Sequence, residues 1–330
     1  MYLLMPLDSL KNKKICIIYG GWSEEREISL MSGQAVYDVL KGSDYEVFIL
    51  DLKNNKQMLS EFVNNNSIDI IFNLIHGKGG EDGLVQSWIE DLKIDYVGSN
   101  SVSSSTSFSK ITTKKIWAEH KLRTPDFITS TELLNYLCDD KDSNITELKT
   151  EINKKCEVFF ENNHKFVFKP SCSGSSVGIK IYDDLNLLLN DKKDILSNNS
   201  SEYLIEAFID GSEYTAPIIN GKVLPIIKIE TKREFYNYEA KYLDDNTSFS
   251  FPEFSTEQEL SIKEVCLKAF ESLNCRGWGR VDFFIDKDIN LIEINTIPGM
   301  TSHSLVPMSA KHLGMSYLQL VEELLINAEK

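Results

Sequence analysis

Short apolar runs alternate with helical patterns over the first third of this chain of 330 residues. The expected strands are 15–19, 47–50 and 68–74, and the expected helices are 28–40 and 84–92. Strands separated by helices of this length predict a parallel sheet that is covered on both faces. Ligands of such sheets bind beyond the carboxyl ends of the strands, where Gly20-Gly21 and segment 76–83 fall.

The rest of the chain predicts further strands and helices. The expected helices are 110–120, 147–161, one that starts at Thr256 and one at 317–328, and the expected strands are 166–169, 179–182, 203–206, 214–219, 222–229, 280–286 and 291–295. Asn220-Gly221 is a strong hairpin signal, and Thr256 with Glu259 three residues later fits a capping box.

Three segments have no regular pattern. The small-residue stretch 98–108 is a linker or the start of a helix, and the polar run 188–202 is expected to be exposed. Segment 231–254 lacks clean periodicity, and a loop of this length inside a compact domain is usually functional or mobile.

Charge and cysteine content argue against several classes of function. Acidic residues (50) outnumber basic ones (35), and the net charge of −15 argues against non-specific binding to nucleic acid or to an anionic membrane surface. The 6 cysteines include no C-x-x-C pair, which favours reduced thiols over a disulfide framework. No segment fits a signal peptide or a membrane span of about 18 apolar residues. We therefore expect a cytosolic globular protein.

Asp282, Glu293 and Asn295 are candidates for a magnesium site. Asp282 lies on one expected strand, and Glu293 and Asn295 lie at i and i+2 of the next, so the last two share a face. If the strands pair as a hairpin, three hard oxygen ligands converge, and Mg²⁺ takes its remaining ligands from phosphate and water. A solvated sheet face is the alternative. The apolar residues around them favour the metal site, because acids on a packed face need partners.

The Gly/Ser loop 171–178 follows an expected strand that ends at Lys169-Pro170. Small residues with free N–H groups and hydroxyls suit phosphate oxygens, and Lys169 supplies a positive charge. The spacing of a Walker A loop is absent, and an ordinary turn is the alternative.

Other candidates are less specific. Segment 20–27 lacks the G-x-G-x-x-G of a nicotinamide site, and its acids suit either an amine ligand or the helix dipole. Arg280 suits an oxyanion, a phosphoryl group or a salt bridge. Segment 298–304 can present N–H groups to an anion, and His76 and His303 are candidates for proton transfer or ligand binding.

Together these motifs resemble the D-alanine–D-alanine ligase family of the ATP-grasp superfamily. The similar segments, in the order of the family, are GGWSEEREISLMSG (20–33), LIHGKGGEDGLVQ (74–86), KPSCSGSSVG (169–178), YEAKYL (238–243), GWGRVD (277–282) and LIEINTIPGMTSHSLVPM (291–308). They span nearly the whole chain, and HGKGGEDG and NTIPGMTSHSLVP are highly specific.

The resemblance implies an α/β chain of three domains, α+β in its ATP-grasp part. A parallel-sheet substrate domain (1–107) is expected before a central (108–205) and a C-terminal (206–330) ATP-grasp subdomain, with 231–254 as a mobile lid. ATP is expected to phosphorylate the carboxylate of one D-alanine, and the amine of a second to attack the acyl phosphate. The products are D-alanyl-D-alanine for peptidoglycan synthesis, ADP and phosphate. The family also implies a cytoplasmic homodimer that uses Mg²⁺, as two ions, with Mn²⁺ as a substitute.

The resemblance implies roles for residues near the first D-alanine. Glu25 matches the acid that holds its ammonium group, and His76 matches the histidine beside it. Ser175 and Tyr242 match a hydrogen-bonded pair that links Glu25 to the lid.

Further matches concern the other ligands. Arg280 and the N–H of Gly299 match the oxyanion site, and Ser304 and Leu305 match residues that bind the carboxylate of the second D-alanine. The expected ATP-binding residues are Lys110, Lys169, Ser176, Glu206, Ala207, Ile209, Glu213 and Lys241. Asp282, Glu293 and Asn295 match the Mg²⁺ ligands.

Two departures and three alternatives accompany this interpretation. Cys172-Ser173 replaces a charged pair that many members carry, and the polar segment 139–163 has no assigned role. A D-alanine–D-lactate ligase is the alternative within the family, although Tyr242 fits the dipeptide product better. A ligase for another carboxylate and amine and a non-catalytic nucleotide sensor are the others, and the sensor is disfavoured because Arg280 and the expected metal ligands are all present.

Overall fold

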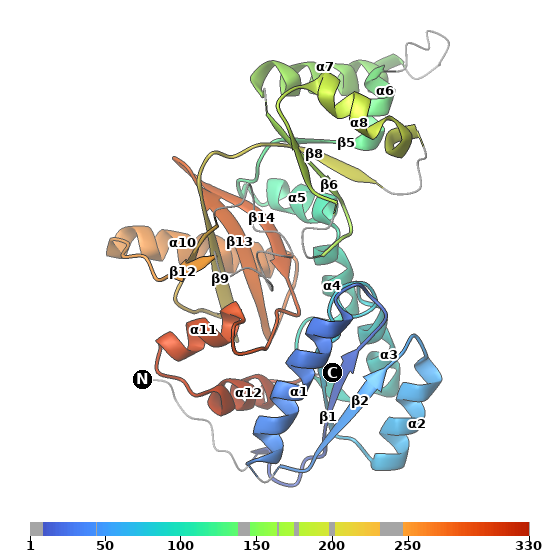
Figure 1. Ribbon diagram of the computed structural model, residues 1–330, viewed down its shortest axis with the longest axis vertical. Coiled ribbons are helices and arrows are strands. Elements are labelled where there is room, and N and C mark those ends of the chain that lie inside the picture. Colours follow the sequence, from blue (N-terminus) through green and yellow to red (C-terminus); the bar gives the residue numbers. More distant parts are fainter. Residues whose placement is uncertain are drawn as a thin grey trace.

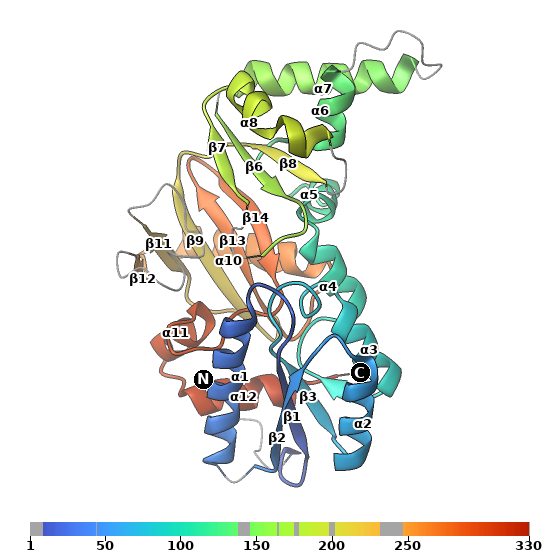
Figure 2. The same ribbon diagram turned by 45° about the vertical axis from the view of Figure 1, so that its right-hand side comes forward.

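The computed structural model describes residues 9–43, 45–137, 146–163, 165–174, 178–197, 202–231 and 247–329. Figures 1 and 2 show an elongated chain with three sheets along its long axis, the first sheet at one end, the second at the other and the third between them. The described cysteines, all free thiols, are Cys16, Cys156, Cys172, Cys266 and Cys275. Within the same residues, no helix has both the length and the apolar character to cross a membrane.

The first sheet is four-stranded and parallel, in the order β2-β1-β3-β4. Its strands and covering helices are β1 (Ile15–Gly20), β2 (Val47–Leu52), β3 (Ile70–Asn73), β4 (Asp95–Tyr96), α1 (Arg26–Lys41), α2 (Lys56–Asn66) and α3 (Leu84–Leu92). Ile15 and Ile17 pack in one core with residues of α1, whereas Cys16 and Ile18 pack in another with residues of α2 and α3. The predicted parallel sheet with both faces covered is confirmed.

Two helices, α4 (Ser101–Phe108) and α5 (Lys110–Glu119), lead away from the first sheet. The side chain of Asn100 caps α4 by accepting from the N–H of Ser103 at 2.8 Å. Ser103, Ser104 and Ser107 are buried, and their small side chains allow α4 to approach its neighbours closely. The serine-rich stretch is therefore a helix.

The second sheet is four-stranded and antiparallel, in the order β5-β8-β6-β7. Its elements are β5 (Phe127–Thr129), β6 (Phe166–Pro170), β7 (Lys180–Tyr182), β8 (Tyr203–Ala207), α6 (Ser130–Leu137), α7 (Thr146–Asn162) and α8 (Leu185–Ser197). The sequence predicts that the run 188–202 is exposed, and this is wrong at its start. Leu188 lies on α8 and is fully buried against this sheet, because Leu185 and Leu189 of the same helix pack against the same apolar cluster.

The third sheet has six antiparallel strands, with β10 beside β9 and the others in the order β12-β11-β9-β13-β14. Its strands and the helices that follow are β9 (Ser212–Ile219), β10 (Lys222–Val223), β11 (Ile227–Glu230), β12 (Ser248–Ser250), β13 (Trp278–Ile285), β14 (Ile289–Asn295), α10 (Thr256–Ser272), α11 (Leu305–His312) and α12 (Tyr317–Ile326). β10 pairs with β9 across Asn220-Gly221, as that dipeptide predicts.

Two local predictions in this sheet are corrected. The single strand expected at 222–229 is divided into β10 and β11, because Pro225 between them has no N–H to donate to a ladder. The capping box of α10 begins one residue earlier than predicted. Ser255 Oγ accepts from the N–H of Gln258 at 3.2 Å, and Gln258 Oε1 accepts from the N–H of Ser255 at 3.0 Å.

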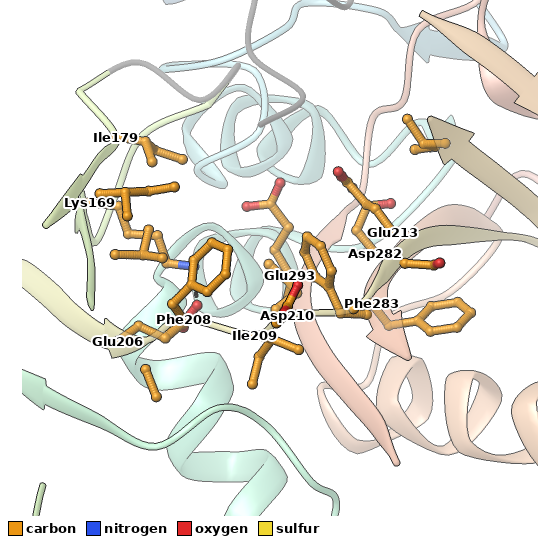
Figure 3. Close-up of a pocket in the computed structure, with 18 of the residues that line it drawn as sticks. Lys169, Ile179, Glu206, Phe208, Ile209, Asp210, Glu213, Asp282, Phe283 and Glu293 are labelled. Atoms are coloured by element: carbon orange, nitrogen blue, oxygen red, sulfur yellow. Dashed lines mark hydrogen bonds and ion pairs between the residues drawn. The ribbon is translucent and has the colours of Figure 1, made fainter. Parts of the chain in front are cut away.

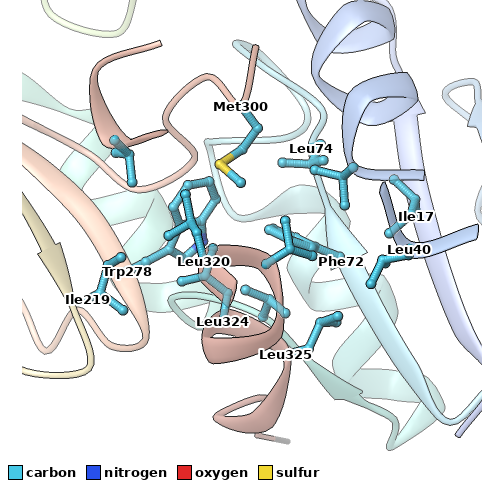
Figure 4. Close-up of a cluster of buried hydrophobic side chains, with 14 of the residues drawn as sticks. Ile17, Leu40, Phe72, Leu74, Ile219, Trp278, Met300, Leu320, Leu324 and Leu325 are labelled. Carbon is cyan, nitrogen blue, oxygen red and sulfur yellow. The ribbon is translucent and has the colours of Figure 1, made fainter. Parts of the chain in front are cut away.

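The last helix completes the core beneath the first sheet (Figure 4). Leu320 and Leu324 of α12 pack in one cluster with Phe72 of β3 and Trp278 of β13. The rings of Phe72 and Trp278 meet edge to face, with centroids 5.6 Å apart. Segments from both ends of the chain therefore share one apolar core, which fixes the first sheet against the third.

Candidate active site

A cavity of about 450 Å³ lies between the second and third sheets (Figure 3). Its wall includes the apolar residues Val167, Ile179, Ile181, Phe208, Ile209, Phe283 and Ile292. Figure 3 shows Lys169 and Glu206 on one side of the cavity and Glu213 and Asp282 on the other, with Glu293 between them. Apolar walls with a few charged groups, in a cavity of this size, are typical of a small-molecule site.

Many residues that the sequence predicts for ATP and metal binding line this one cavity. They are Lys110, Lys169, Glu206, Ala207, Ile209, Glu213, Asp282 and Glu293. They come from α5, β6, β8, β9, β13 and β14 and from the loop after β8, so only the tertiary structure brings them together.

Glu206 is buried between two lysines at one side of the cavity. Its Oε1 lies 2.8 Å from Nζ of Lys169, and its Oε2 lies 2.6 Å from Nζ of Lys114. Burial raises the pKa of Glu206, but the two ammonium groups outweigh it and hold that pKa below its usual value. Burial in turn lowers the pKa of Lys114 to about 8.

Lys114 was not among the residues predicted from the sequence. The available signal was its position four residues after Lys110, which places both lysines on one face of α5. A lysine on a face that packs against the molecule needs a carboxylate partner, and Glu206 supplies one.

Lys110 links α5 to the Gly/Ser loop and to the acidic side of the cavity. Its Nζ donates to the carbonyl of Ser173 at 2.6 Å and lies 3.1 Å from Oε2 of Glu293. Its backbone N–H donates to the carbonyl of Ser171 at 3.0 Å. The start of the predicted phosphate loop is thus attached to the helix that carries a predicted phosphate lysine.

The predicted hairpin of acids is confirmed. β13 pairs with β14 so that Asp282 lies opposite Glu293 and Arg280 lies opposite Asn295. Residues at i and i+2 of a strand share a face, so these four side chains lie on one face of the third sheet. Oδ1 of Asp282 also accepts from Thr215 Oγ1 at 2.6 Å.

The donor set on this face fits a magnesium ion. Asp282 and Glu293 offer carboxylate oxygens toward the cavity, and Oδ1 of Asn295 accepts from the N–H of Ile297 at 2.9 Å. Hard oxygen ligands in small number, completed by substrate phosphates, are what Mg²⁺ prefers. No cluster of three or more His, Cys, Asp or Glu suited to a metal occurs among the described residues, so phosphate oxygens would have to supply further ligands.

Glu25 precedes α1 and lies against the Gly/Ser loop. A methyl group at Gly174 would be only 2.2 Å from Oε1 of Glu25, so the loop backbone passes directly over that carboxylate. The side chain of Glu25 is largely buried, and its N–H donates to Ser23 Oγ at 3.1 Å. The structure therefore brings Glu25 from the first sheet to the loop of the second.

His76 is buried between α1 and the segment that follows β14. Its Nδ1 lies 2.9 Å from the carbonyl of Ile297, and its Nε2 lies 3.1 Å from Ser32 Oγ, which also accepts from the N–H of Met300 at 3.1 Å. Burial lowers the pKa of His76, although the charge of Glu25 acts in the opposite direction. Burial thus favours the neutral form of the His76 ring, whose two nitrogens are both engaged, whereas His303 is exposed.

Glu81 is a buried acid that the sequence analysis did not single out. Its Oε1 accepts from the N–H of Gly77 at 2.9 Å and lies 3.8 Å from Nδ1 of His76. Burial and then the charge of Glu25 raise the pKa of Glu81 to about 8. Its place in the HGKGGEDG segment was the signal that could have found it.

The residues expected at the second amino acid lie at the start of α11. Ser304 occupies the N-cap position, and its Oγ accepts from the N–H of Thr301 at 3.0 Å. A methyl group at Gly299 would be 2.7 Å from Ser304 Oγ, and Leu305 is buried as the first residue of the helix. Gly299, Ser304 and Leu305 therefore form one compact turn.

Four predicted residues lie outside the described part of the chain, namely Ser175, Ser176, Lys241 and Tyr242. Of the segment 231–254, the structure describes Thr231 and residues 247–254. β12, within the second of these pieces, pairs with β11 at the edge of the third sheet.

Comparison with known families gives two matches. The model described as "D-ala D-ala ligase C-terminus" matches residues 137–326. The model described as "D-ala D-ala ligase N-terminus" matches residues 14–66 and 54–99.

Similar proteins and structures carry related names. The D-alanine--D-alanine ligase of Vesicomyosocius okutanii is 39% identical over 314 residues, which is 94% of this chain and 99% of the relative. The D-alanine--D-alanine ligase of Buchnera aphidicola is 37% identical over 318 residues, 95% of this chain and 98% of the relative. The structure of the Bacillus anthracis D-alanine--D-alanine ligase complexed with ATP has a TM-score of 0.76 at 34% identity and covers 95% of this chain and 96% of its own. The VanG D-Ala:D-Ser ligase of Enterococcus faecalis has a TM-score of 0.75 at 25% identity and covers 95% of this chain and 98% of its own.

Proposed function

This chain belongs to the D-alanine–D-alanine ligase family, and from that premise we propose that it joins two D-alanines to D-alanyl-D-alanine with ATP. It is an ATP-dependent ligase whose dipeptide product serves peptidoglycan synthesis. The observation that carries the proposal is that buried lysines and acids line one cavity. Glu25 lies against the Gly/Ser loop, which begins at the edge of this cavity.

ATP occupies the cavity between the second and third sheets in this proposal. The apolar wall accommodates the base, Glu206 and Glu213 bind base and ribose, and the backbone of Ala207 and Ile209 contributes at the edge. Lys110 and Lys169 meet the phosphates, since both are buried ammonium groups that line the cavity. Ser176 and Lys241 complete this set as residues assigned by sequence similarity alone.

Asp282, Glu293 and Asn295 hold Mg²⁺ in this proposal. Two ions bind, and Mn²⁺ can replace Mg²⁺. When bound, the ion neutralises phosphate charge and orients the transferred group. Lys110 balances the charge of Glu293, and Arg280 balances that of Asp282.

The reaction proceeds in two steps. A carboxylate oxygen of the first D-alanine forms a bond to the γ-phosphorus, and the bond to the bridging oxygen breaks, so ADP leaves and D-alanyl phosphate remains. The ammonium group of the second D-alanine releases one proton to solvent, the resulting amine attacks the acyl carbon, and its second proton leaves with the phosphate. The C–O bond to phosphate then breaks, which yields the dipeptide and phosphate.

Each step needs residues of this chain at stated positions. Glu25 holds the ammonium group of the first D-alanine, with His76 beside it, and Ser304 and Leu305 bind the carboxylate of the second. Arg280 and the N–H of Gly299 stabilise the negative oxygen that develops when the amine attacks. Ser175 and Tyr242 are assigned to the link between Glu25 and the segment 231–254 by sequence similarity.

The organisation of the chain is also part of the proposal. We divide it into a substrate domain (1–107), a central ATP-grasp subdomain (108–205) and a C-terminal one (206–330). We further propose a homodimer in the cytoplasm. We also propose that it binds neither nucleic acid nor membrane, and the net charge of −15 supports this second point.

The test is ADP release with ATP, Mg²⁺ and D-alanine, with the product weighed by mass spectrometry. L-Alanine, D-alanine with D-lactate, and D-alanine with D-serine are the comparison mixtures, the last because a structural neighbour is named for D-serine. We expect D-alanine-dependent ADP release and the mass of D-alanyl-D-alanine. A mixed product would move the assignment to another acceptor, and ADP release without any ligated product would contradict the proposal.

A further inference from the structure

Lys114 is the most deeply buried charged group near the cavity, and the reaction described above does not use it. Its side chain is 0% exposed, and it does not line the cavity, although its partner Glu206 does. Nζ of Lys114 also contacts Thr124 Oγ1, which in turn donates to the carbonyl of Leu291 in β14 at 2.8 Å. Lys114 is therefore fixed behind Glu206, on the side away from the cavity.

The two lysines at Glu206 are not equivalent. Lys169 lines the cavity and can turn toward a phosphate, whereas Lys114 is held by Thr124 within the protein. When Lys169 serves the phosphates, Glu206 retains one counter-charge. A buried carboxylate without any counter-charge would take up a proton, because ionisation in a low-dielectric interior is costly.

We propose that Lys114 is a positioning residue that keeps Glu206 ionised and aimed at the base after Lys169 moves to the phosphates, and so sets the preference for a 6-aminopurine nucleotide. This inference rests on the proposed function, because Glu206 must face the base. An ionised carboxylate only accepts hydrogen bonds. It therefore accepts one from the 6-amino group of adenine and repels the 6-carbonyl oxygen of hypoxanthine, which is also an acceptor. A protonated Glu206 donates as well and tolerates that carbonyl.

The experiment compares ATP with inosine triphosphate, which replaces the 6-amino group by a carbonyl. Lys114→Met removes the charge at similar length, and Lys115→Met, one residue further on the exposed side of α5, is the matched control. For Lys114→Met we expect KM for ATP to rise about 10- to 100-fold, because the variant loses a charge-assisted contact. We expect kcat to change less than about threefold. We expect its ATP-over-ITP ratio of kcat/KM to fall about tenfold or more. Lys115→Met keeps the parental ratio.

Two further variants separate this role from a structural one. In Lys114→Met/Glu206→Gln both charges are absent, so the double variant should bind ATP more tightly than Lys114→Met alone. Thr124→Val removes the hydroxyl that holds the Lys114 ammonium in place and keeps its charge. This variant should lower the ATP-over-ITP ratio in the same direction, which tests the idea even if Lys114→Met does not fold.

The outcomes are distinct. A Lys114→Met enzyme with a lower melting temperature but the parental ATP-over-ITP ratio would overturn the positioning role and leave the proposed function intact. If Glu206→Gln left KM for ATP unchanged, Glu206 would not face the base, and the inference would fail while D-alanine-dependent turnover still supported the ligase activity. Absence of turnover by the parental enzyme would reject the proposed function itself.

Discussion

Arg280 and Asp282 lie two residues apart on β13 and form a bidentate pair. Nε and Nη2 of Arg280 each donate to one carboxylate oxygen of Asp282 at 2.8 Å. Both side chains are buried, and Thr215 adds a third donor to the same carboxylate. The pair fixes the plane of the guanidinium, so a proposed oxyanion donor and a proposed metal ligand are oriented as one unit.

Arg280→Lys should lower kcat of the ligase reaction by about 100- to 1000-fold, the usual cost of losing one oxyanion donor. Lysine keeps the positive charge but lacks the planar fork that matches a carboxylate. Initial rates of ADP release at saturating ATP and D-alanine measure the effect. Arg276→Lys is the control, since Arg276 pairs with Glu329, away from the cavity. A kcat of Arg280→Lys within threefold of the parent would remove Arg280 from the oxyanion site.

Glu25→Gln should weaken binding of the first D-alanine about 10- to 100-fold, because an amide replaces the charged partner of an ammonium group. KM for ATP should change less than threefold. Initial rates over a wide range of D-alanine concentrations separate the two constants. Glu27→Gln, on an exposed acid in the first turn of α1, is the control. An equal loss of ATP affinity with D-alanine affinity unchanged would contradict the assignment.

Glu81 should make the protein less stable as pH rises from 6.5 to 8. In the unfolded chain this carboxyl is ionised above its usual pKa of 4.5, whereas in the folded protein its pKa is about 8. The folded state thus binds more protons in this interval, and the contribution present at low pH is lost as pH rises, by about 1–2 kcal/mol. The lowered pKa of His76 acts mainly below its usual value of 6.5, and because the unfolded imidazole is still half protonated there, it offsets a small part of the Glu81 effect at the start of the interval.

Urea unfolding at both pH values measures this effect. Glu81→Gln mimics the protonated acid and should remove the pH-dependent difference, whereas Glu24→Gln, on an exposed acid, should preserve it. An unchanged pH slope in Glu81→Gln would show that another group carries it.

Phe72→Ala should lower the free energy of unfolding by about 3–5 kcal/mol, since it opens a cavity in the core shared by β3, β13 and α12. Phe48→Ala, on the partly buried strand β2 of the same sheet, should cost less. Urea titration of both variants provides the comparison. Equal losses would indicate that the shared core contributes no more than the edge of the sheet.

Much of the first sheet was predictable because β1 and β3 are apolar and largely buried and the helices between the strands are regularly spaced. Helix α2 was not, since Leu59 and Val63 are its only buried residues and the rest of the helix is polar or partly exposed. Short elements such as β5 (Phe127–Thr129) also escaped, because three residues carry too little periodicity to be recognised. The pairing of Asp282 with Glu293 was predictable from alternation along two adjacent strands.

The sequence by itself determined the family, the order of the main strands and many of the residues that line the cavity, because local periodicity and motif spacing are properties of the chain alone. Only the tertiary structure decided that α12 covers the first sheet, that Gly174 lies on Glu25 and that Lys114 is the inner partner of Glu206. These contacts join segments far apart in the chain. They depend on which apolar faces are buried together and on which buried charges then need partners. Local sequence patterns predict neither the packing of these faces nor the pairing of these charges.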